Sequence, residues 1–459
     1  MPETPADLPE ALPVDWEAAT RGALEHLRAL IRLDTTNPPG NERLAVDYLA
    51  AELSRDGIPF EVVEPAPGRA SLVARLRGTG ARGPLLLNGH LDVVPAEAEH
   101  WRHPPFGAEE HDGCIWGRGA IDMKNMVAMS LAVVQLLHRS GVRLDRDVIF
   151  AAVADEEAGS RLGSRYLVEH HPELVRAEYV LNELGGYTFY FGDTVFYPVQ
   201  VAEKGICWFE LVVEGPPGHG SMPRADGAVL KIARAVHALA RGRLRHEVTP
   251  VVEAFLRRLA EAAPFPERHA LPLLLQPRLA GALLDLMAKK DPAQAGSLGA
   301  LVHDTVTPTG LSAGRKVNVL PGTARATVDG RLLPGRSVAD FVASVQAEVG
   351  PDVRVNVLES WEGTVFDSRT PLYDAIASAI ERHHPGAVPV PFMIPGFTDS
   401  HAYARLGATC YGFTPVRMPP GLSLPALYHG HDERIPVEGF AWGLRVLHDL
   451  VVRFCAAGR

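Results

Sequence analysis

The feature that most constrains the fold is a regular alternation of apolar, strand-like runs with helical patterns between about residues 16 and 200. Such alternation is typical of α/β layering around a largely buried sheet. The same pattern returns after residue 360. Strands are predicted at 71–78, 84–90, 147–155, 179–186 and 408–415, and helices at 16–33, 42–56, 123–139, 160–170 and 438–457.

The middle of the chain has a different order of elements. We predict, in sequence order, strand 204–215, helix 225–243, strand 306–313, strand 324–333, helix 337–350 and strand 353–360. This βαββαβ order is that of a ferredoxin-like, split-βαβ domain. A helical stretch rich in Leu and Ala, at about 246–305, is added to it. One α/β domain, formed by residues 1–200 and 361–459, is therefore expected to contain a second domain, 201–360, as an insertion.

Composition limits the function. The chain has 459 residues, of which 46% are hydrophobic and 22% charged, as in an ordinary soluble protein with two or three domains. A formal net charge of −10 argues against nucleic acid or an anionic membrane as the partner and favours a small molecule. The N-terminus lacks the features of a signal peptide and no long apolar run follows, so a cytoplasmic location is expected. The four cysteines form no CxxC pattern, which indicates neither a thiolate zinc site nor a disulfide framework.

Polar side chains stand where predicted buried strands end. His90 and Asp92 follow one strand in "GHLDVVP", and Glu183 ends another in "NELGG". Asp122 comes just before the helix at 123–139. Each residue has an ordinary alternative explanation, because a loop His and Asp can form a surface pair and Asp is a favoured helix N-cap.

Two further segments carry the same residue types. "ADEEAGS" places Glu156 and Glu157 after a buried strand, and "YHGHDERIP" contributes His429 and His431 late in the chain. Strand ends of one α/β unit converge on one edge of the sheet, where such proteins bind ligands. Two imidazoles and three carboxylates form a ligand set for Zn²⁺, Mn²⁺ or Co²⁺. A carboxylate shared by two ions about 3.5–4 Å apart would activate a water and polarise a carbonyl.

Motifs of other enzyme classes are absent or incomplete. The sequence contains no GxxxxGK[ST] and no HExxH, and "GHGSM" around Ser221 does not match the GxSxG of serine hydrolases. His100, His103 and His111 lie in a segment rich in Pro and Gly, and we interpret them as surface residues.

Taken in order, "GHLDVVP", "GRGAIDMK", "DEEAGS", "NELGG", "GHGSMP", "NVLPG…DGRLLPG" and "YHGHDERIP" resemble the motifs of one metallopeptidase family. That family includes glutamate carboxypeptidase, acetylornithine deacetylase, succinyl-diaminopimelate desuccinylase, aminoacylase and carboxypeptidase S. The resemblance covers nearly the whole chain. It implies an α/β/α catalytic domain with an inserted lid and dimerisation domain, and two zinc ions that Co²⁺ or Mn²⁺ could replace.

The resemblance also implies roles for single residues. Asp122 would bridge the two zinc ions, and the peptide bond that follows it would be cis. Glu156 would be the general base, and Asp92 would orient His90. The remaining ligands would be His90 and Glu183 for one ion, and Glu157 and His429 for the other. His429 is preferred to His431 because the family's late ligand stands four residues before a Glu, here Glu433.

In the inserted domain, His219 matches a His that reaches the active site of a partner subunit in the family, which implies a homodimer. Asn318 and Arg331 match residues that bind the substrate's carboxylate, and Gly396 and Thr398 match a loop that lines the substrate pocket. The helical insert is longer than in compact members of the family, which leaves substrate size and the geometry of the oligomer open.

The expected function is hydrolysis of the amide bond of a small peptide or an N-acyl amino acid that carries a free carboxylate. A carboxypeptidase or dipeptidase is the first reading, and an N-acyl-amino-acid deacylase is the alternative. A catalytically silent peptide-binding relative is the alternative of another class, although the intact Glu156 and the complete ligand set argue against it.

Overall fold

The computed structural model describes residues 14–242, 244–422, 424 and 427–457, so part of the N-terminal segment discussed above lies outside the described residues. The chain divides into two compact units. Unit 1 comprises residues 1–201, 366–391 and 398–459, and unit 2 comprises residues 202–365 and 392–397. The borders of unit 2 at 201/202 and 365/366 compare with the predicted borders at 200/201 and 360/361. Residues 392–397 also belong to unit 2, which was not predicted.

Unit 1 is built on a mixed sheet with the strand order β1-β2-β6-β3-β7-β18-β9. Strands β6, β3, β7 and β18 run parallel to one another, and β2 pairs with β6 in the antiparallel sense. The main strands are β1 (Phe60–Ala66), β2 (Arg69–Leu76), β3 (Leu85–His90), β6 (Val148–Val153), β7 (Tyr179–Asn182), β8 (Phe189–Phe191), β9 (Thr194–Glu203), β17 (Val388–Ile394) and β18 (Thr409–Gly412). A separate small sheet contains β4 (Glu109–His111), β5 (Cys114–Trp116) and β19 (Arg434–Pro436).

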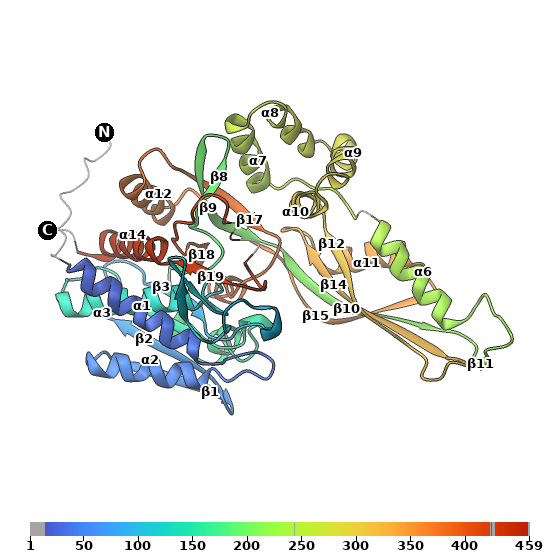
Figure 1. Ribbon diagram of the computed structural model, residues 1–459, viewed down its shortest axis with the longest axis horizontal. Helices are drawn as coiled ribbons and strands as arrows, with labels where there is room; N and C mark the ends of the chain where they lie inside the picture. Colours follow the sequence, from blue (N-terminus) through green and yellow to red (C-terminus); the bar gives the residue numbers. More distant parts are fainter. Residues whose placement is uncertain (1–13, 243, 423, 425–426, 458–459) are drawn as a thin grey trace. The chain divides into compact units, whose positions relative to one another are not determined.

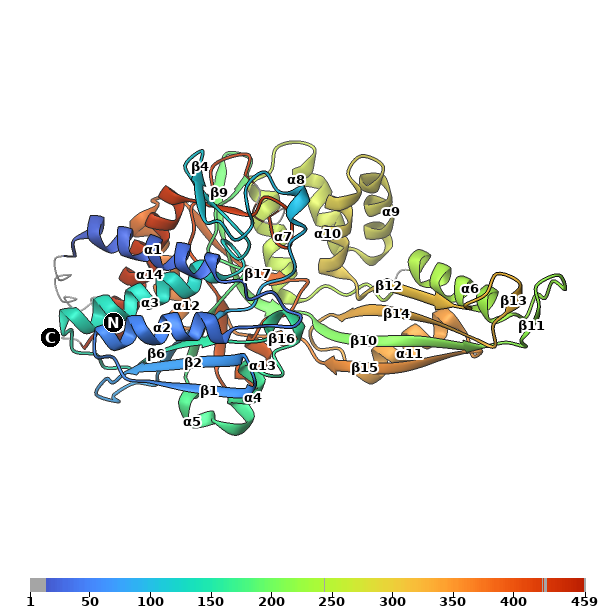
Figure 2. The ribbon, with the colours of Figure 1, turned by 60° about the horizontal axis from the view of Figure 1, so that its bottom comes forward.

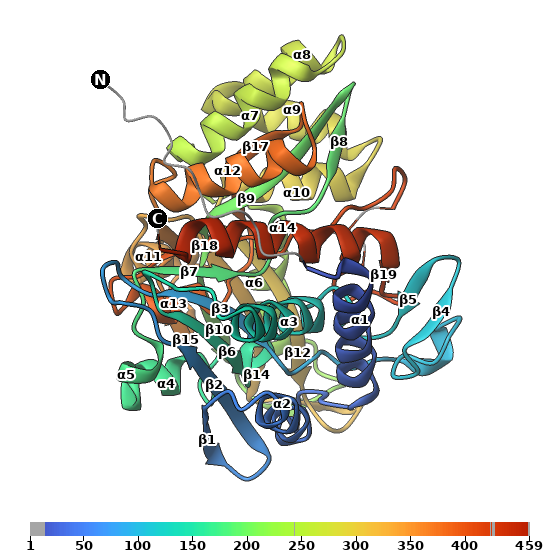
Figure 3. The ribbon, with the colours of Figure 1, turned by 90° about the vertical axis from the view of Figure 1, so that its left-hand side faces the viewer.

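Helices cover both faces of this sheet. Figures 2 and 3 show α2 and α3 on one face, with α1 and α14 further out, and α4, α5 and α13 on the other. The bounds are α1 (Trp16–Arg32), α2 (Arg43–Arg55), α3 (Lys124–Ser140), α4 (Ser164–His170), α5 (Pro172–Val175), α12 (Pro371–His383), α13 (Ser400–Ala404) and α14 (Val437–Cys455), with short 3₁₀ turns η1 (Ala98–His100) and η2 (Glu156–Ala158). The predicted α/β class is confirmed.

Helix α3 lies next to the strand ends and is largely buried. Thirteen of its 17 residues are buried, as its apolar residues on all sides predict. It approaches β3 closely at Gly89, where an added Cβ would lie 2.7 Å from a side-chain methyl of Val127. The Lys124 ammonium donates to the carbonyls of Leu30 and Leu33, both at 2.9 Å, and so ties the start of α3 to the end of α1. These contacts fix the position of the residues just before α3.

Unit 2 contains the predicted βαββαβ order. Its antiparallel sheet has the order β12-β14-β10-β15, and Figure 1 shows α6 and α11 beside it. The core lies between sheet and helices, around Phe209, Leu211, Ile232 and Phe341. The elements are β10 (Gly205–Glu214), β11 (Gly218–His219), α6 (Ala228–Arg241), β12 (Thr305–Ala313), β13 (Val319–Leu320), β14 (Thr323–Leu332), α11 (Val338–Val349), β15 (Val353–Trp361) and β16 (Thr364–Val365).

The stretch predicted as a helical insert is helical. It contains α7 (Pro250–Ala262), α8 (Glu267–Ala270), η3 (Leu271–Leu275), α9 (Pro277–Ala288) and α10 (Pro292–Val302). Among the helices of the described residues, none combines the length and apolarity that spanning a bilayer requires.

Several predicted elements are shorter in the structure, among them the strand predicted over 408–415, which covers only Thr409–Gly412. Two of these differences lie next to acidic residues. The strand predicted over 179–186 ends at Asn182, because Leu184 has a positive φ of 64° and turns the chain. The helix predicted over 160–170 begins at Ser164, because Ser160 also has a positive φ, of 61°. The acidic side chains near these points therefore lie in turns.

Candidate metal centre

The carboxyl ends of three neighbouring parallel strands bring the predicted residues together. His90 is the last residue of β3, Glu183 follows β7, and the η2 turn follows β6. The order β6-β3-β7 thus places His90 between the two acidic segments. This convergence is the one predicted from the sequence.

The first group of side chains consists of His90, Asp122 and Glu183. All three are buried, and one ligand atom of each lies within 4.8 Å of the others. The His90 Nε2 atom lies 3.1 Å from Asp122 Oδ1 and 3.6 Å from Glu183 Oε2. These are the residues predicted for the first metal ion.

The second group shares Asp122 with the first. The His429 Nε2 atom lies 3.2 Å from Asp122 Oδ2 and 3.1 Å from Glu157 Oε2. Asp122 thus offers one carboxylate oxygen to each group, which is the arrangement a bridging ligand needs. The peptide bond between Asp122 and Met123 is cis, as expected.

Glu156 lies beside both groups without belonging to either. Its carboxylate is 4.0 Å from His90 Nε2, and its side chain is buried. Burial, together with the charge of Glu183, raises the pKa of Glu156 well above its usual value, although His90 opposes this effect. Burial also raises the pKa of Glu183 to about 8.

The neighbouring carboxylates raise the pKa of both imidazoles, His90 and His429. Burial opposes the charged form of His90, but the carboxylates of Glu183 and Asp122 outweigh it and raise the pKa well above its usual value. Hydrogen bonds to Asp122 and Glu157 raise the pKa of His429 to about 10. The site therefore favours positive charge strongly.

The residues present fit a pair of divalent cations. Asp122, Glu156 and Glu183 form ion pairs with His90, and Asp122 and Glu157 form ion pairs with His429. The Oε1 atom of Glu157 is buried and has no hydrogen-bond partner in the described part of the chain. Buried carboxylates set among imidazoles are the donor set that a zinc-type cation takes.

Asp92 holds the turn that carries two of the acids. Its carboxylate accepts hydrogen bonds from the backbone N–H groups of Glu156 and Glu157, both at 3.1 Å, and from Asn37 Nδ2 at 2.9 Å. The predicted contact with His90 exists, but it is made by the main-chain carbonyl: His90 Nδ1 donates to Asp92 O at 2.9 Å, whereas the carboxylate is 3.7 Å away. Asp92 thereby leaves Nε2 of His90 facing the acids.

Glu433 holds the loop that carries Asp122. Its buried carboxylate accepts from the backbone N–H groups of Gly119, Ile121 and Asp122 at 2.7–3.0 Å, and it pairs with the buried Arg118 at 2.7 Å. The sequence motif indicated Glu433 only through its spacing from His429.

His431 lies apart from both groups. Its Nε2 atom is 3.3 Å from Glu97 Oε2, and its ring is 5.1 Å from that of His100. The structure thus brings His429, and not His431, to Asp122.

The remaining predicted residues are described within their own units. In unit 2, His219 is exposed and bonds to Ser221 Oγ at 2.8 Å, while the carbonyl of the exposed Asn318 accepts from Gly220 N. Arg331 forms a two-pronged pair with Asp329, at 2.7 and 2.9 Å. Two further predicted residues follow: Gly396, half-buried in unit 2, and Thr398, buried in unit 1, where its carbonyl accepts from His401 Nδ1 at 2.6 Å.

A family model described as peptidase family M20/M25/M40 matches residues 86–453. The chain belongs to this family. Membership indicates a peptidase- or aminoacylase-type hydrolase and confirms the resemblance that the motifs predicted.

Curated members of the M20 family match along most of the chain. Aminoacylase-1 of Sus scrofa is 28% identical over 435 residues, which is 92% of this chain and 93% of that protein. The N-fatty-acyl-amino acid synthase/hydrolase PM20D1.1 of Danio rerio is 31% identical over 375 residues, 78% of this chain and 70% of that protein.

Solved structures of M20 proteins share the fold. The M20 family metallo-carboxypeptidase Sso-CP2 from Sulfolobus solfataricus aligns with a TM-score of 0.71 at 16% identity, over 94% of this chain and 99% of that one. The YXEP protein of Bacillus subtilis, described as a dinuclear metal binding peptidase from the M20 family, aligns with a TM-score of 0.57 at 13% identity, over 95% and 98% of the two chains.

Glu433→Gln should destabilise this M20 protein, because an amide cannot neutralise the buried Arg118 guanidinium and presents N–H groups to backbone donors. Removing one partner of a buried ion pair costs about 3–5 kcal/mol, and we expect the free energy of unfolding in urea to fall by that amount. Glu438→Gln, an exposed residue of the first turn of α14, is the control and should change it by less than about 1 kcal/mol. Equal stabilities of the two variants would contradict this role of Glu433.

Proposed function

We propose that this chain is a two-zinc amidohydrolase that cleaves the amide bond of a small peptide or an N-acyl amino acid with a free carboxylate. The observation that carries the proposal is the position of Asp122, whose two oxygens face His90 and His429 at 3.1 and 3.2 Å. His90, Asp122 and Glu183 would hold one ion, and Asp122, Glu157 and His429 the other. When bound, the ions would polarise the amide carbonyl and favour deprotonation of a water molecule.

The protein's own groups supply the proton transfer. Glu156 is buried beside both groups and takes part in neither, so its carboxylate is available to accept a proton from the attacking water. It would then pass that proton to the nitrogen of the leaving amine. Asp92 fixes the η2 turn and thereby the position of Glu156.

Recognition of the substrate's carboxylate is assigned to unit 2. Arg331 already forms a two-pronged pair with Asp329, yet its Nη1 atom is buried and has no hydrogen-bond partner within the described residues. A guanidinium group suits a carboxylate because of its planar array of donors. Asn318, Gly396 and Thr398 are proposed to contribute to substrate binding as well.

Two substrate classes share this chemistry. A carboxypeptidase or dipeptidase reaction is supported by the name of the structural neighbour Sso-CP2, and an N-acyl-amino-acid deacylase reaction by the names of the curated relatives, which align over 92% and 78% of this chain. The four cysteines are buried and form no disulfide within the described residues, which supports a reducing compartment such as the cytoplasm.

Hydrolysis of a panel of N-acetyl amino acids and dipeptides, after removal of metal and its replacement by zinc, cobalt or manganese, tests the proposal. We expect turnover of one class and none without metal. A preference for dipeptides would support the peptidase reading, and a preference for N-acetyl amino acids would support the deacylase reading. No hydrolysis of either class by the metal-loaded protein would favour a silent binding relative.

Glu156→Gln should lower kcat by about 10²–10⁴-fold, because the amide cannot accept the proton of the attacking water. Bound metal should be retained, since Glu156 belongs to neither ligand group. Steady-state kinetics and metal analysis check both statements. Glu157→Gln is the matched neighbour and should lose metal, and a reversal of the two metal contents would show that base and ligand had been exchanged.

His429→Ala should remove about one zinc ion per chain and abolish turnover, because its imidazole completes the second ligand group. His431→Ala should keep the metal content of the wild type and change mainly KM, since His431 contacts Glu97 and not Asp122. Metal analysis by mass spectrometry distinguishes the two histidines. Loss of zinc from the His431 variant alone would refute the assignment.

A homodimer is also proposed, in which His219 acts in the active site of the partner subunit and donates to the oxyanion formed on the attacked carbonyl. Two observations support it. His219 lies exposed on β11, and the neighbouring Met222, Val317 and Val319 expose apolar side chains, as a surface that binds another chain would.

Mixing inactive Glu156→Gln subunits with inactive His219→Ala subunits should restore part of the activity, because each mixed dimer would contain one intact site. Activity is measured after subunit exchange has been verified, for example by mass spectrometry of labelled chains. As a control, each variant is diluted with buffer alone and assayed without the other variant. Verified exchange with no recovery would contradict action of His219 in the partner's site.

A further inference from the structure

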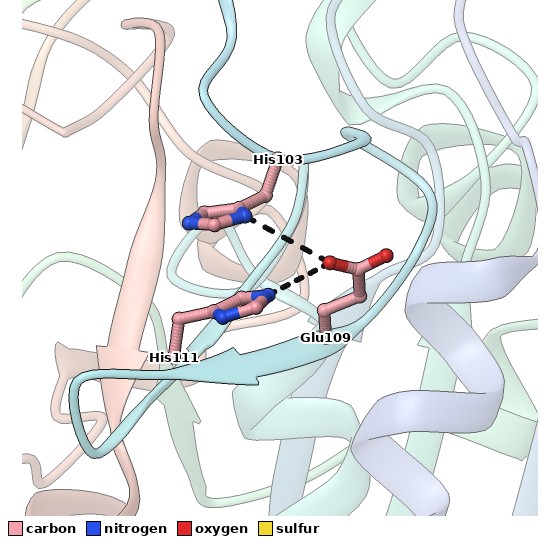
Figure 4. Close-up of side chains that lie close together, drawn as sticks. All are labelled: His103, Glu109 and His111. Carbon is pink, nitrogen blue, oxygen red and sulfur yellow. Dashed lines mark hydrogen bonds and ion pairs between the residues drawn. The ribbon is translucent and has the colours of Figure 1, made fainter.

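A third cluster of possible metal ligands lies outside the groups around Asp122. It consists of His103, Glu109 and His111, one ligand atom of each lying within 4.8 Å of the others. Figure 4 shows both imidazoles directed at the carboxylate of Glu109. We interpreted these histidines from the sequence as surface residues. They are partly exposed, but they are arranged around one point.

The donor atoms converge on that point. Glu109 Oε2 lies 2.7 Å from His111 Nε2 and 3.8 Å from His103 Nδ1. Ligand atoms around a tetrahedral zinc ion lie about 3.3 Å apart, a value between these two distances. The imidazole rings are stacked, with centroids 3.7 Å apart and planes at 9°, so their nitrogen-bearing edges lie side by side.

The hairpin that carries two of the ligands is well defined. Glu109 and His111 are two residues apart on β4, so their side chains project from the same face. Strand β4 pairs with β5, and the turn between them is made by Asp112 and Gly113, both with positive φ. The Nε1 atom of Trp116 donates to the carbonyl of His111 at 3.0 Å, which fixes this residue further.

The segment that carries the third ligand is anchored independently. The backbone N–H of Arg102 donates to Asp432 Oδ1 at 2.8 Å, and the N–H of Arg118 donates to the carbonyl of Pro105 at 2.7 Å. The ring of Trp116 packs edge-on against that of His103, with centroids 4.7 Å apart. The position of His103 is therefore set before any ion binds, which lowers the entropic cost of binding.

We propose that His103, Glu109 and His111 form a third divalent-metal site, suited to zinc or copper. Zinc and copper bind well to two imidazoles and a carboxylate, whereas magnesium and calcium favour oxygen ligands alone. The side chains of His103, Glu109 and His111 are 25%, 45% and 40% exposed, so an ion can enter from solvent and keep water at its remaining positions. None of these three residues belongs to the two ligand groups that share Asp122.

Equilibrium dialysis of the full-length enzyme against buffered micromolar Zn²⁺, followed by metal analysis, tests the proposal. The wild type should bind one equivalent more than His103→Ala or His111→Ala. His138→Ala, which removes an exposed histidine at the end of α3, should match the wild type. Because only the difference counts, the result does not depend on how many ions the groups around Asp122 hold. Equal zinc content in wild type and both cluster variants would overturn the proposal.

Copper provides a second readout that a folding defect cannot imitate. One equivalent of Cu²⁺ added to the zinc-loaded wild type should give an electron paramagnetic resonance spectrum with coupling to two nitrogen atoms. Glu109→Gln, which keeps the size of the side chain, should weaken Cu²⁺ binding while leaving the circular dichroism spectrum unchanged. A wild-type spectrum without coupling to two nitrogens, or unchanged Cu²⁺ affinity in Glu109→Gln, would contradict the site.

Discussion

The buried carboxylate of Asp122, with an imidazole on each side, is the constraint around which unit 1 is arranged. Its oxygens lie 3.1 and 3.2 Å from His90 and His429, and Glu157 and Glu183 lie against the same imidazoles. Carboxylates this close, away from water, repel one another unless protons or cations lie among them. The same carboxylates raise the pKa values of His90 and His429, because a positive charge reduces the repulsion. Bound cations would reduce it without protonation of the acids.

Several charged groups next to the site fix the position of the segments that carry the ligand residues. Glu433 binds the Asp122 loop from 311 residues further along the chain, and Asp92 binds the η2 turn that carries Glu156 and Glu157. Arg69 pairs with Glu42 and with Asp155, the residue before that turn. Arg69 and Arg118 are thus paired with carboxylates that lie outside the two ligand groups.

The elements that place the site could be predicted because local patterns encode them. Apolar runs that stop at an acid or a His locate the ends of β3, β6 and β7, and parallel strands bring such ends to one edge. Glu433 and Arg118 could not be recognised in this way, since their pairing joins distant segments. Likewise, the sequence predicted that Asp92 contacts His90 but not that its carbonyl makes the contact, because backbone geometry decides which group is nearer.

Whether Asp122 bridges two metal ions can be seen by anomalous diffraction at the zinc absorption edge, from crystals of the zinc-loaded protein. We predict two peaks beside Asp122, about 3.5–4 Å apart, one next to His90 and Glu183 and the other next to Glu157 and His429. A single peak at this position, or two peaks that do not share Asp122, would contradict the account.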